Sequence, residues 1–262
     1  MNESGRGATV LAIHSLGLDA HAFDAWRKAF GSGWHIATFD QCGHGKRVHE
    51  ASSSLERYVA DAAEVLAACD AGPVHVVGHS MGGAVAALLA SRTAAEQSGR
   101  IATLTLIASP ARGVPAFLER GAAVRASGVE SVIGATMARW FGEEGAVRDA
   151  KPQNYARSAL GAMQAEGLAG AWEALAQFPG YQDIAGSLPP TLCIASANDI
   201  STPPQAMQAI VDAFDQAGRG DEVALKTLAE GGHMAPLYAT PDLLDALTGH
   251  WRAHGADSSL KH

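Results

Sequence analysis

The sequence predicts an α/β protein whose mostly parallel sheet is flanked by helices. Three observations support this. Short and nearly continuous apolar runs recur along the chain, as in strands that are buried on both faces of a parallel sheet. Segments with apolar residues at every third or fourth position separate these runs and are typical of helices. One predicted strand-to-helix junction also carries a serine between glycines, Ser80.

The composition is that of a globular, acidic protein. The chain has 262 residues, of which 47% are hydrophobic and 18% charged, so it can bury a sizeable core, and we expect one core with an insertion. The formal net charge is -8 and no basic cluster is longer than Lys46-Arg47. Nucleic acids and anionic membranes are therefore not expected partners.

The sequence favours a cytoplasmic location. No apolar stretch precedes Ala8, and no segment approaches the ~18 uninterrupted apolar residues of a membrane span. The cysteines, Cys42, Cys69 and Cys193, are odd in number and form no C-x-x-C pair. We expect neither a disulfide framework nor a zinc site.

Strands and helices alternate along the first 110 residues. The run Ala-Thr-Val-Leu-Ala-Ile at 8–13 predicts a buried strand, and Asp19 can cap the helix that follows. Glycines in the loop 40–46 permit tight turns after the second strand. The elements expected in this part are strands at 8–13, 35–39, 74–79 and 103–108 and helices at 20–30, 55–69 and 81–96.

The alternation stops after Pro110. Residues 111–186 contain Ala-rich helical stretches, and we expect them to form a helical lid over the carboxyl edge of the sheet, where ligands bind in open α/β folds. The core is then predicted to comprise residues 1–110 and 187–262. Its remaining elements are strands at 191–196 and 223–228 and helices at 204–217 and 241–253, followed by a tail at 257–262 that we expect to be frayed.

The motif Gly78-His79-Ser80-Met81-Gly82 is the G-x-S-x-G pattern of a nucleophile elbow, a sharp turn between a strand and a helix. Such a turn strains the serine backbone, and a side chain at either glycine would crowd the neighbouring strand or helix. Ser80 is therefore the candidate nucleophile. The alternative is a glycine-rich turn with an exposed serine.

A serine nucleophile needs a general base, and the base needs a carboxylate that orients it. Asp199 follows the strand after the lid and His233 follows the last strand, in the chain order Ser, Asp, His. Asp199 is the only acid between Leu192 and Asp212, and the loop after the strand at 103–108 carries none. Asp199 could instead cap a helix or a turn.

The other histidines fit packing or turn positions better than catalytic ones. His79 lies inside the serine motif with its side chain expected to point away from the serine, and His44 stands between two glycines. His14 ends the first strand, where a local hydrogen bond is favoured over metal ligation. No two histidines share helical spacing with a carboxylate, so we expect no metal and no other cofactor.

Five short segments follow one another along nearly the whole chain: His-Ser-Leu-Gly at 14–17, Asp-Gln-Cys-Gly-His-Gly at 40–45, Gly-His-Ser-Met-Gly-Gly at 78–83, Asn-Asp at 198–199 and Gly-His-Met-Ala-Pro-Leu at 232–237. In this order they resemble the signatures of α/β-hydrolases. Within that superfamily the chain is most similar to 3-oxoadipate enol-lactonases, on the basis of Ser15-Leu16-Gly17 and Arg139-Trp140-Phe141. Haloalkane dehalogenases and epoxide hydrolases are similar in fold but have an aspartate where Ser80 stands.

The resemblance implies a serine hydrolase that cleaves a carboxylic ester or lactone. The carbonyl would acylate Ser80, while the backbone amides of Leu16 and Met81 hold the oxyanion. Water activated by His233 would then release the acid.

The resemblance also places His14, Ser15, Arg139 and Trp140 on the substrate side of the site. A 3-oxoadipate enol-lactone carries a carboxylate, for which Arg139 is the candidate partner. Ser15 departs from the family pattern, since many members have glycine there. The oxyanion loop is therefore expected to differ in shape.

A second departure concerns the start of the fold. The strand at 8–13 matches the one that the family usually counts third, which leaves no room for the customary antiparallel hairpin before it. This strand would then lie next to an exposed or partner-covered sheet edge, an aggregation hazard that homodimerisation can shield.

Other functions are compatible with the same three residues. A general carboxylesterase, a carbon–carbon hydrolase of ring-cleavage products and a cofactor-free perhydrolase would all act on small molecules with this triad. A ligand-binding receptor on the same fold is the non-enzymatic alternative, which hydrolysis of an activated ester would exclude. A dinucleotide-binding protein is disfavoured, because the serine motif lacks the second glycine and no acidic residue follows at ribose-binding spacing.

Overall fold

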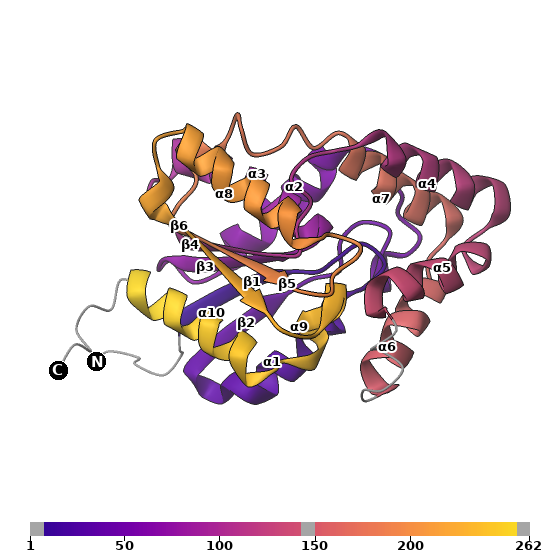
Figure 1. The fold of residues 1–262 in the computed structure, drawn as a ribbon, viewed down its shortest axis with the longest axis horizontal. Coiled ribbons are helices and arrows are strands. Elements are labelled where there is room, and N and C mark those ends of the chain that lie inside the picture. The colour runs from indigo at the N-terminus through magenta and orange to yellow at the C-terminus, as the bar shows by residue number, and fades with distance from the viewer. Residues whose placement is uncertain (1–7, 143–149, 256–262) are drawn as a thin grey trace.

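The computed structural model describes residues 8–142 and 150–255, so the expectation for the tail at 257–262 lies outside the described residues. Six parallel strands form one sheet in the order β2-β1-β3-β4-β5-β6 (Figure 1). The strands are β1 (Ala8–Ile13), β2 (Trp34–Thr38), β3 (Val74–His79), β4 (Ile101–Ile107), β5 (Thr191–Ser196) and β6 (Val223–Leu228).

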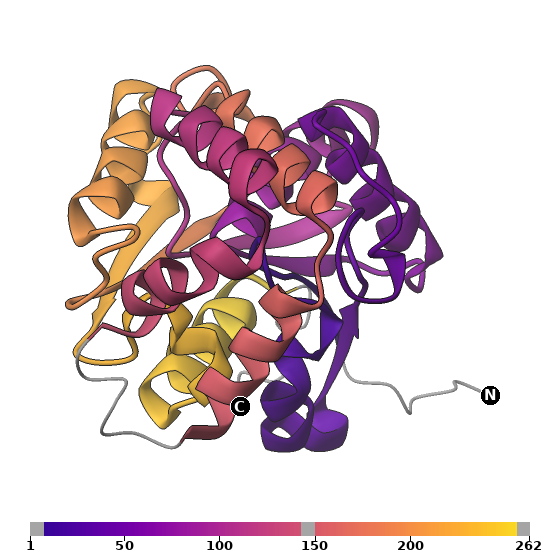
Figure 2. The same ribbon diagram turned by 90° about the vertical axis from the view of Figure 1, so that its right-hand side faces the viewer.

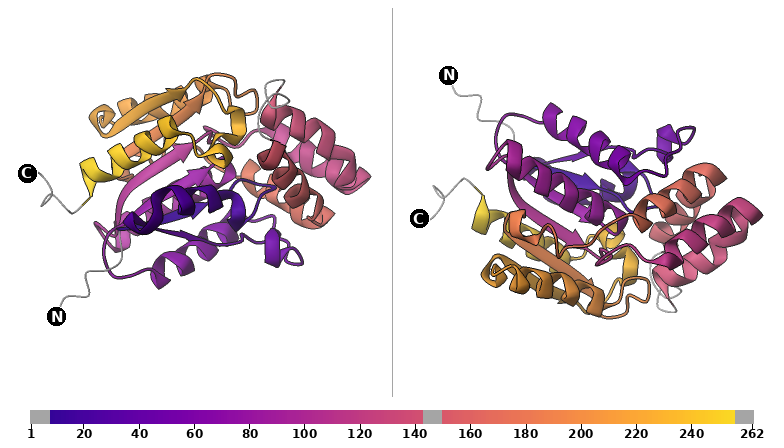
Figure 3. Two further views of the ribbon diagram at one scale, coloured as in Figure 1. Left: turned by 90° about the horizontal axis from the view of Figure 1, so that it is seen from below. Right: turned by 90° about the horizontal axis from the view of Figure 1, so that it is seen from above.

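Helices cover both faces of the sheet. Figure 3 shows α1 and α10 on one face and α2, α3 and α8 on the other. The helices are α1 (Asp24–Phe30), α2 (Leu55–Ala68), α3 (Met81–Glu96), α4 (Pro115–Ser127), α5 (Glu130–Phe141), α6 (Ala150–Gly161), α7 (Ala165–Ala176), α8 (Pro204–Gln216), α9 (Ala235–Tyr238) and α10 (Pro241–His254). None of the described helices is both long enough and apolar enough to cross a membrane.

The predicted α/β architecture is confirmed, with small differences at the element ends. The expected helix at 20–30 begins as a 3-10 turn, Ala20–Phe23, before α1. Its cap is Asp19, whose carboxylate accepts a hydrogen bond from the His21 amide at 2.9 Å. Between β4 and β5 the described residues form α4 to α7 and no strand, and Figure 2 shows these helices grouped at one end of the sheet.

The strand order determines where a site can form. From β1 the chain crosses to β2 on one side, and β3 then returns to the other side of β1. The carboxyl ends of β1 and β3 therefore flank a topological switch point, where open α/β sheets bind ligands. β1 is paired on both sides, so the edge beside it is formed by β2, with Trp34 aligned to Ala8.

The core is thickest around the central strands. All six residues of β3 (Val-His-Val-Val-Gly-His) are buried, so the strand shows no alternation of buried and exposed positions. Trp26 and Trp251 are the largest side chains with no exposed surface and pack beneath the sheet through α1 and α10. This rigid base supports the loops at the carboxyl end of the sheet.

Candidate active site

Ser80 lies between the last residue of β3 and the first residue of α3. Its backbone has φ 53° and ψ -117°, a conformation that L-residues with side chains rarely adopt. The Ser80 amide donates to the Ile107 carbonyl at 2.8 Å, and the Ser80 carbonyl accepts from the Gly83 amide at 2.8 Å. These bonds hold the strained backbone of Ser80 at the carboxyl edge of the sheet.

The two glycines of the motif are required by close backbone approaches. A β-carbon at Gly78 would lie 2.3 Å from the carbonyl oxygen of Gly82. A β-carbon at Gly82 would lie 2.2 Å from the carbonyl oxygen of Ile13. The elbow therefore packs against itself and against β1 with no space for side chains.

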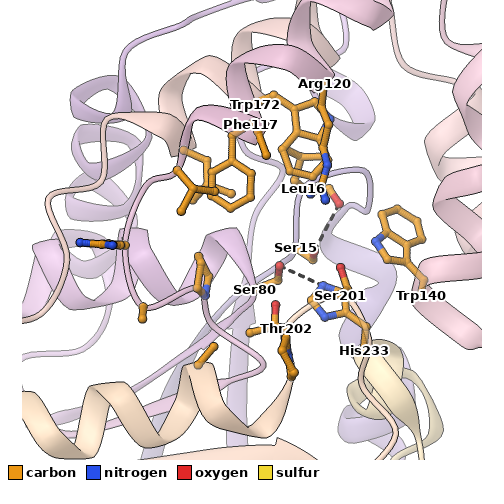
Figure 4. A pocket seen from close by; sticks show the side chains of 18 residues that line it. Ser15, Leu16, Ser80, Phe117, Arg120, Trp140, Trp172, Ser201, Thr202 and His233 are labelled. Atoms are coloured by element: carbon orange, nitrogen blue, oxygen red, sulfur yellow. Dashed lines mark hydrogen bonds between the residues drawn. The ribbon is translucent and has the colours of Figure 1, made fainter.

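The structure brings Ser80, Asp199 and His233 together from loops that follow β3, β5 and β6. His233 Nε2 lies 3.0 Å from Ser80 Oγ, and His233 Nδ1 lies 2.9 Å from Asp199 Oδ2 (Figure 4 shows the first of these contacts). The other oxygen of Asp199 accepts hydrogen bonds from the amides of Ser201 and Thr202, both at 2.8 Å. Asp199 and His233 are buried.

The tautomer of His233 follows from these partners. A carboxylate only accepts hydrogen bonds, so Nδ1 carries the hydrogen and Nε2 presents its lone pair to the serine hydroxyl. The two backbone amides occupy Asp199 Oδ1 and hold the carboxylate in place. This is the arrangement of a nucleophile, a base and an orienting acid.

Of the two predicted oxyanion donors, one follows Ser80 in the chain and the other lines the cavity with it. Met81 is the first residue of α3, where an amide has no acceptor within the helix and the helix dipole favours negative charge. Leu16 follows β1 and lines the same cavity as Ser80. The Ser15 side chain points toward Ser80, and its hydroxyl donates to the Leu16 carbonyl at 3.2 Å (Figure 4).

A cavity of about 320 Å³ opens above Ser80 and His233. Its far wall belongs to the helices between β4 and β5 and to the loop before them. Aromatic rings dominate this wall, and two arginines also line it. The residues concerned are Phe117, Trp140, Trp172, Arg112 and Arg120. A site of this size and lining suits a small molecule with an anionic group.

Arg120, which the sequence analysis missed, lines the cavity, whereas Arg139 is not among the lining residues. The Arg139 guanidinium donates instead to the hydroxyl of Thr136 at 2.9 Å. Arg120 lies over the rings of Phe117 and Trp172, at 5.6 and 4.9 Å from their centroids. Phe117 and Arg120 are three residues apart on one helix, so their side chains are neighbours on its surface. This spacing was the signal in the sequence that could have pointed to Arg120.

His14 lies behind the cavity wall. It is fully buried, its Nδ1–H donates to the Ser15 carbonyl at 2.8 Å, and its Nε2 accepts from the Gln41 amide at 3.0 Å. Both ring nitrogens are thus used within the protein. Burial lowers the pKa of His14 to about 4 and those of His44 and His79 to about 3, so these three rings are neutral near pH 7.

The comparison with protein families decides the assignment. Residues 8–240 match the model of the alpha/beta hydrolase fold family. The chain belongs to this family. The candidate nucleophile, acid and base of this α/β hydrolase follow one another along the chain as Ser80, Asp199 and His233. Within residues 8–142 and 150–255, no group of three or more His, Cys, Asp or Glu side chains is placed to hold a metal ion.

Relatives of this α/β hydrolase are hydrolases as well. It is 28% identical to 3-oxoadipate enol-lactonase 1 of Acinetobacter baylyi over 76% of this chain and 74% of the relative. It is also 28% identical to the (E)-2-((N-methylformamido)methylene)succinate hydrolase of that organism, over 54% of this chain and 53% of the relative. The protein is therefore an enzyme of the hydrolase kind.

Solved structures confirm the fold. A thermophilic esterase from Thermogutta terrifontis matches with a TM-score of 0.83 and 23% identity, over 95% of this chain and 92% of the other. The enol-lactonase from Burkholderia xenovorans matches with a TM-score of 0.82 and 19% identity, over 96% of this chain and 94% of the other.

Proposed function

We propose that this α/β hydrolase cleaves carboxylic esters or lactones through an acyl-enzyme on Ser80. The observation that carries the proposal is the continuous hydrogen-bonded chain from Ser80 through His233 to Asp199, built on a strained serine backbone. Such strain persists in proteins mainly where function uses it.

The proposed reaction has two stages. His233 Nε2 takes the hydroxyl proton as Ser80 Oγ bonds to the substrate carbonyl carbon, and the amides of Leu16 and Met81 stabilise the oxyanion. The oxyanion collapses, the carbon–oxygen ester bond breaks, and the leaving oxygen takes the proton from His233. Water then attacks the acyl group, again losing its proton to His233, and Ser80 regains a proton as the acid departs. Asp199 stabilises the imidazolium in both stages.

We expect the acyl-enzyme to be observable. Mixing the enzyme with p-nitrophenyl butyrate should release a burst of p-nitrophenol, because the activated leaving group makes acylation faster than deacylation. Intact mass spectrometry of the quenched reaction should show one butyryl group, and peptide mapping should place it on Ser80. An adduct on another residue, or turnover that involves no adduct in either experiment, would contradict the proposal.

Arg120 is the best-placed group to hold the carboxylate of an anionic lactone such as a 3-oxoadipate enol-lactone. The guanidinium is half-buried against aromatic rings, and burial lowers its pKa from the usual value. Burial is the cause of this shift, with no carboxylate of residues 8–142 and 150–255 acting on the guanidinium. A carboxylate would supply the missing partner. The predicted lid, residues 111–186, would thus select substrates.

Replacing Arg120 with methionine should lower kcat/KM selectively for an anionic substrate. The methionine keeps apolar contact with the aromatic rings but removes the charge, and a charged hydrogen bond is worth roughly 1.5–3 kcal/mol, or about ten- to a hundredfold in kcat/KM. The measurement compares the enol-lactone with a neutral ester of similar size.

Arg139→Met provides the matched control, because Arg139 is half-buried on the neighbouring helix but does not line the cavity. It should leave the ratio of the two kcat/KM values unchanged. If Arg139→Met instead gave the selective loss and Arg120→Met did not, the original assignment to Arg139 would be restored. Equal losses on both substrates in Arg120→Met would favour a general carboxylesterase.

A further inference from the structure

The loop that carries His233 has little rigidity of its own. Gly231 and Gly232 precede the histidine with φ values of 110° and 56°, a pair of left-handed residues without side chains to pack. The position of His233 relative to Ser80 therefore depends on contacts from neighbouring elements. One of these contacts reaches the backbone of His233 itself.

That contact comes from His79, the residue immediately before Ser80. Its Nε2 lies 2.8 Å from the carbonyl oxygen of His233, and the centroids of the two rings are 5.4 Å apart. A carbonyl oxygen only accepts, so Nε2 of His79 carries the hydrogen. His79 has no exposed surface, and burial lowers its pKa to about 3, so the neutral ring keeps this donor near pH 7.

We propose that His79 is a positioning residue that fixes the backbone of the base against the nucleophile elbow. This inference rests on the proposed function, because it takes Ser80 and His233 as nucleophile and base. His79 and Ser80 share a peptide bond, so movement of the His233 loop away from the elbow must stretch the bond between His79 Nε2 and the His233 carbonyl. The bond therefore restrains the 3.0 Å contact between His233 Nε2 and Ser80 Oγ.

A second donor holds the same region at a different point. The indole N–H of Trp26 donates to the Pro236 carbonyl at 2.9 Å, three residues after His233. This bond anchors the start of α9 but does not reach the His233 peptide. Loss of the His79 donor should therefore loosen the base locally while the following turn stays in place.

The test compares two replacements of His79. Methionine fills a similar volume without a donor, whereas the side-chain amide of glutamine can present an N–H close to the position of histidine Nε2. His79→Met should lower kcat for p-nitrophenyl butyrate at least tenfold with little change in KM, since small displacements of catalytic groups can cost about a hundredfold in rate. His79→Gln should recover most of kcat. The rate of Ser80 labelling by a fluorophosphonate should follow kcat in both variants.

His75→Met is the matched control. His75 lies on the same strand and the same face as His79, is buried, and bonds to the Thr103 hydroxyl at 2.8 Å, but it lies at the other end of β3. This variant should lower the melting temperature without changing kcat or the labelling rate.

Three results would overturn the role of His79: wild-type kcat in His79→Met, equal losses of kcat in His79→Met and His79→Gln, or a His79→Met protein that fails to fold. Failure of the proposed function is distinguishable, because wild-type enzyme would then show no labelling of Ser80 at all.

Discussion

Replacing Ser80 with alanine is expected to lower kcat for p-nitrophenyl butyrate by roughly 10⁶-fold, the scale seen when a serine hydrolase loses its nucleophile. Within residues 8–142 and 150–255, the hydroxyl is hydrogen-bonded to His233. The Ser80→Ala protein keeps the oxyanion donors and the cavity. We therefore expect an inactive protein that still binds the product acid.

The measurement combines initial rates with thermal unfolding. Ser80→Ala should melt within a few degrees of the wild type, because alanine meets the same backbone strain at φ 53° that serine does. Ser109→Ala is the matched control, since Ser109 is a buried serine just after β4 whose hydroxyl pairs with Tyr181 at 3.0 Å. It should retain activity. Wild-type rates in Ser80→Ala would remove Ser80 from the mechanism.

Acidification is expected to unfold the protein between about pH 6 and pH 4.5, because four buried histidines and the partly buried His250 must take up protons when the chain unfolds. Burial is the largest cause of the lowered pKa in each case. The histidines and their folded-state pKa values are His14, His75 and His250 at about 4 and His44 and His79 at about 3.

The sign and the size follow from linkage. An unfolded histidine titrates near about 6.5, above the folded values, so the unfolded chain binds more protons as the pH falls below 6.5 and the folded state loses stability. Each histidine contributes a slope of about 1.4 kcal/mol per pH unit, and five contribute about 7 kcal/mol per pH unit. Over one pH unit this loss is comparable with a total stability of about 5–15 kcal/mol. The loss continues until the pH reaches the folded pKa values.

Urea unfolding at a series of pH values between 7.5 and 5 checks this prediction. The free energy of unfolding should fall steeply below pH 6.5, and a variant with one fewer buried histidine, His75→Met, should show a shallower slope. A free energy of unfolding that stays constant from pH 7.5 to 5 would show that these rings are protonated in the folded protein.

Much of the site could be predicted from local patterns. The elbow was recognisable because its turn leaves no space for side chains at two positions, which must therefore be glycine. A β-carbon at Gly78 would clash with the Gly82 carbonyl, and one at Gly82 would clash with the Ile13 carbonyl. Asp199 and His233 could be assigned because parallel strands bring the loops at their carboxyl ends to one edge of the sheet. Chain order along the strands was then enough to place the three side chains together.

Other features depended on how the elements pack. The sequence predicted an arginine beside the substrate, but the rotation of each lid helix decides which arginines face the cavity: Arg120 lines it and Arg139 does not. The sequence predicted His14 on the substrate side of the site. In the structure the backbone amide of Gln41, in the loop after β2, donates a hydrogen bond to Nε2 of His14.

The sequence by itself determined the alternation of strands and helices, the strained serine and the order of the three candidate catalytic residues, because apolar runs, glycines and chain order act locally or through the parallel sheet. Only the tertiary structure decided that β2 forms the edge next to β1, that Arg120 lines the cavity, and that His79 bonds to the loop of His233. These features join residues far apart in the chain. Their positions depend on crossover directions and helix rotations, which leave no periodic trace in the sequence.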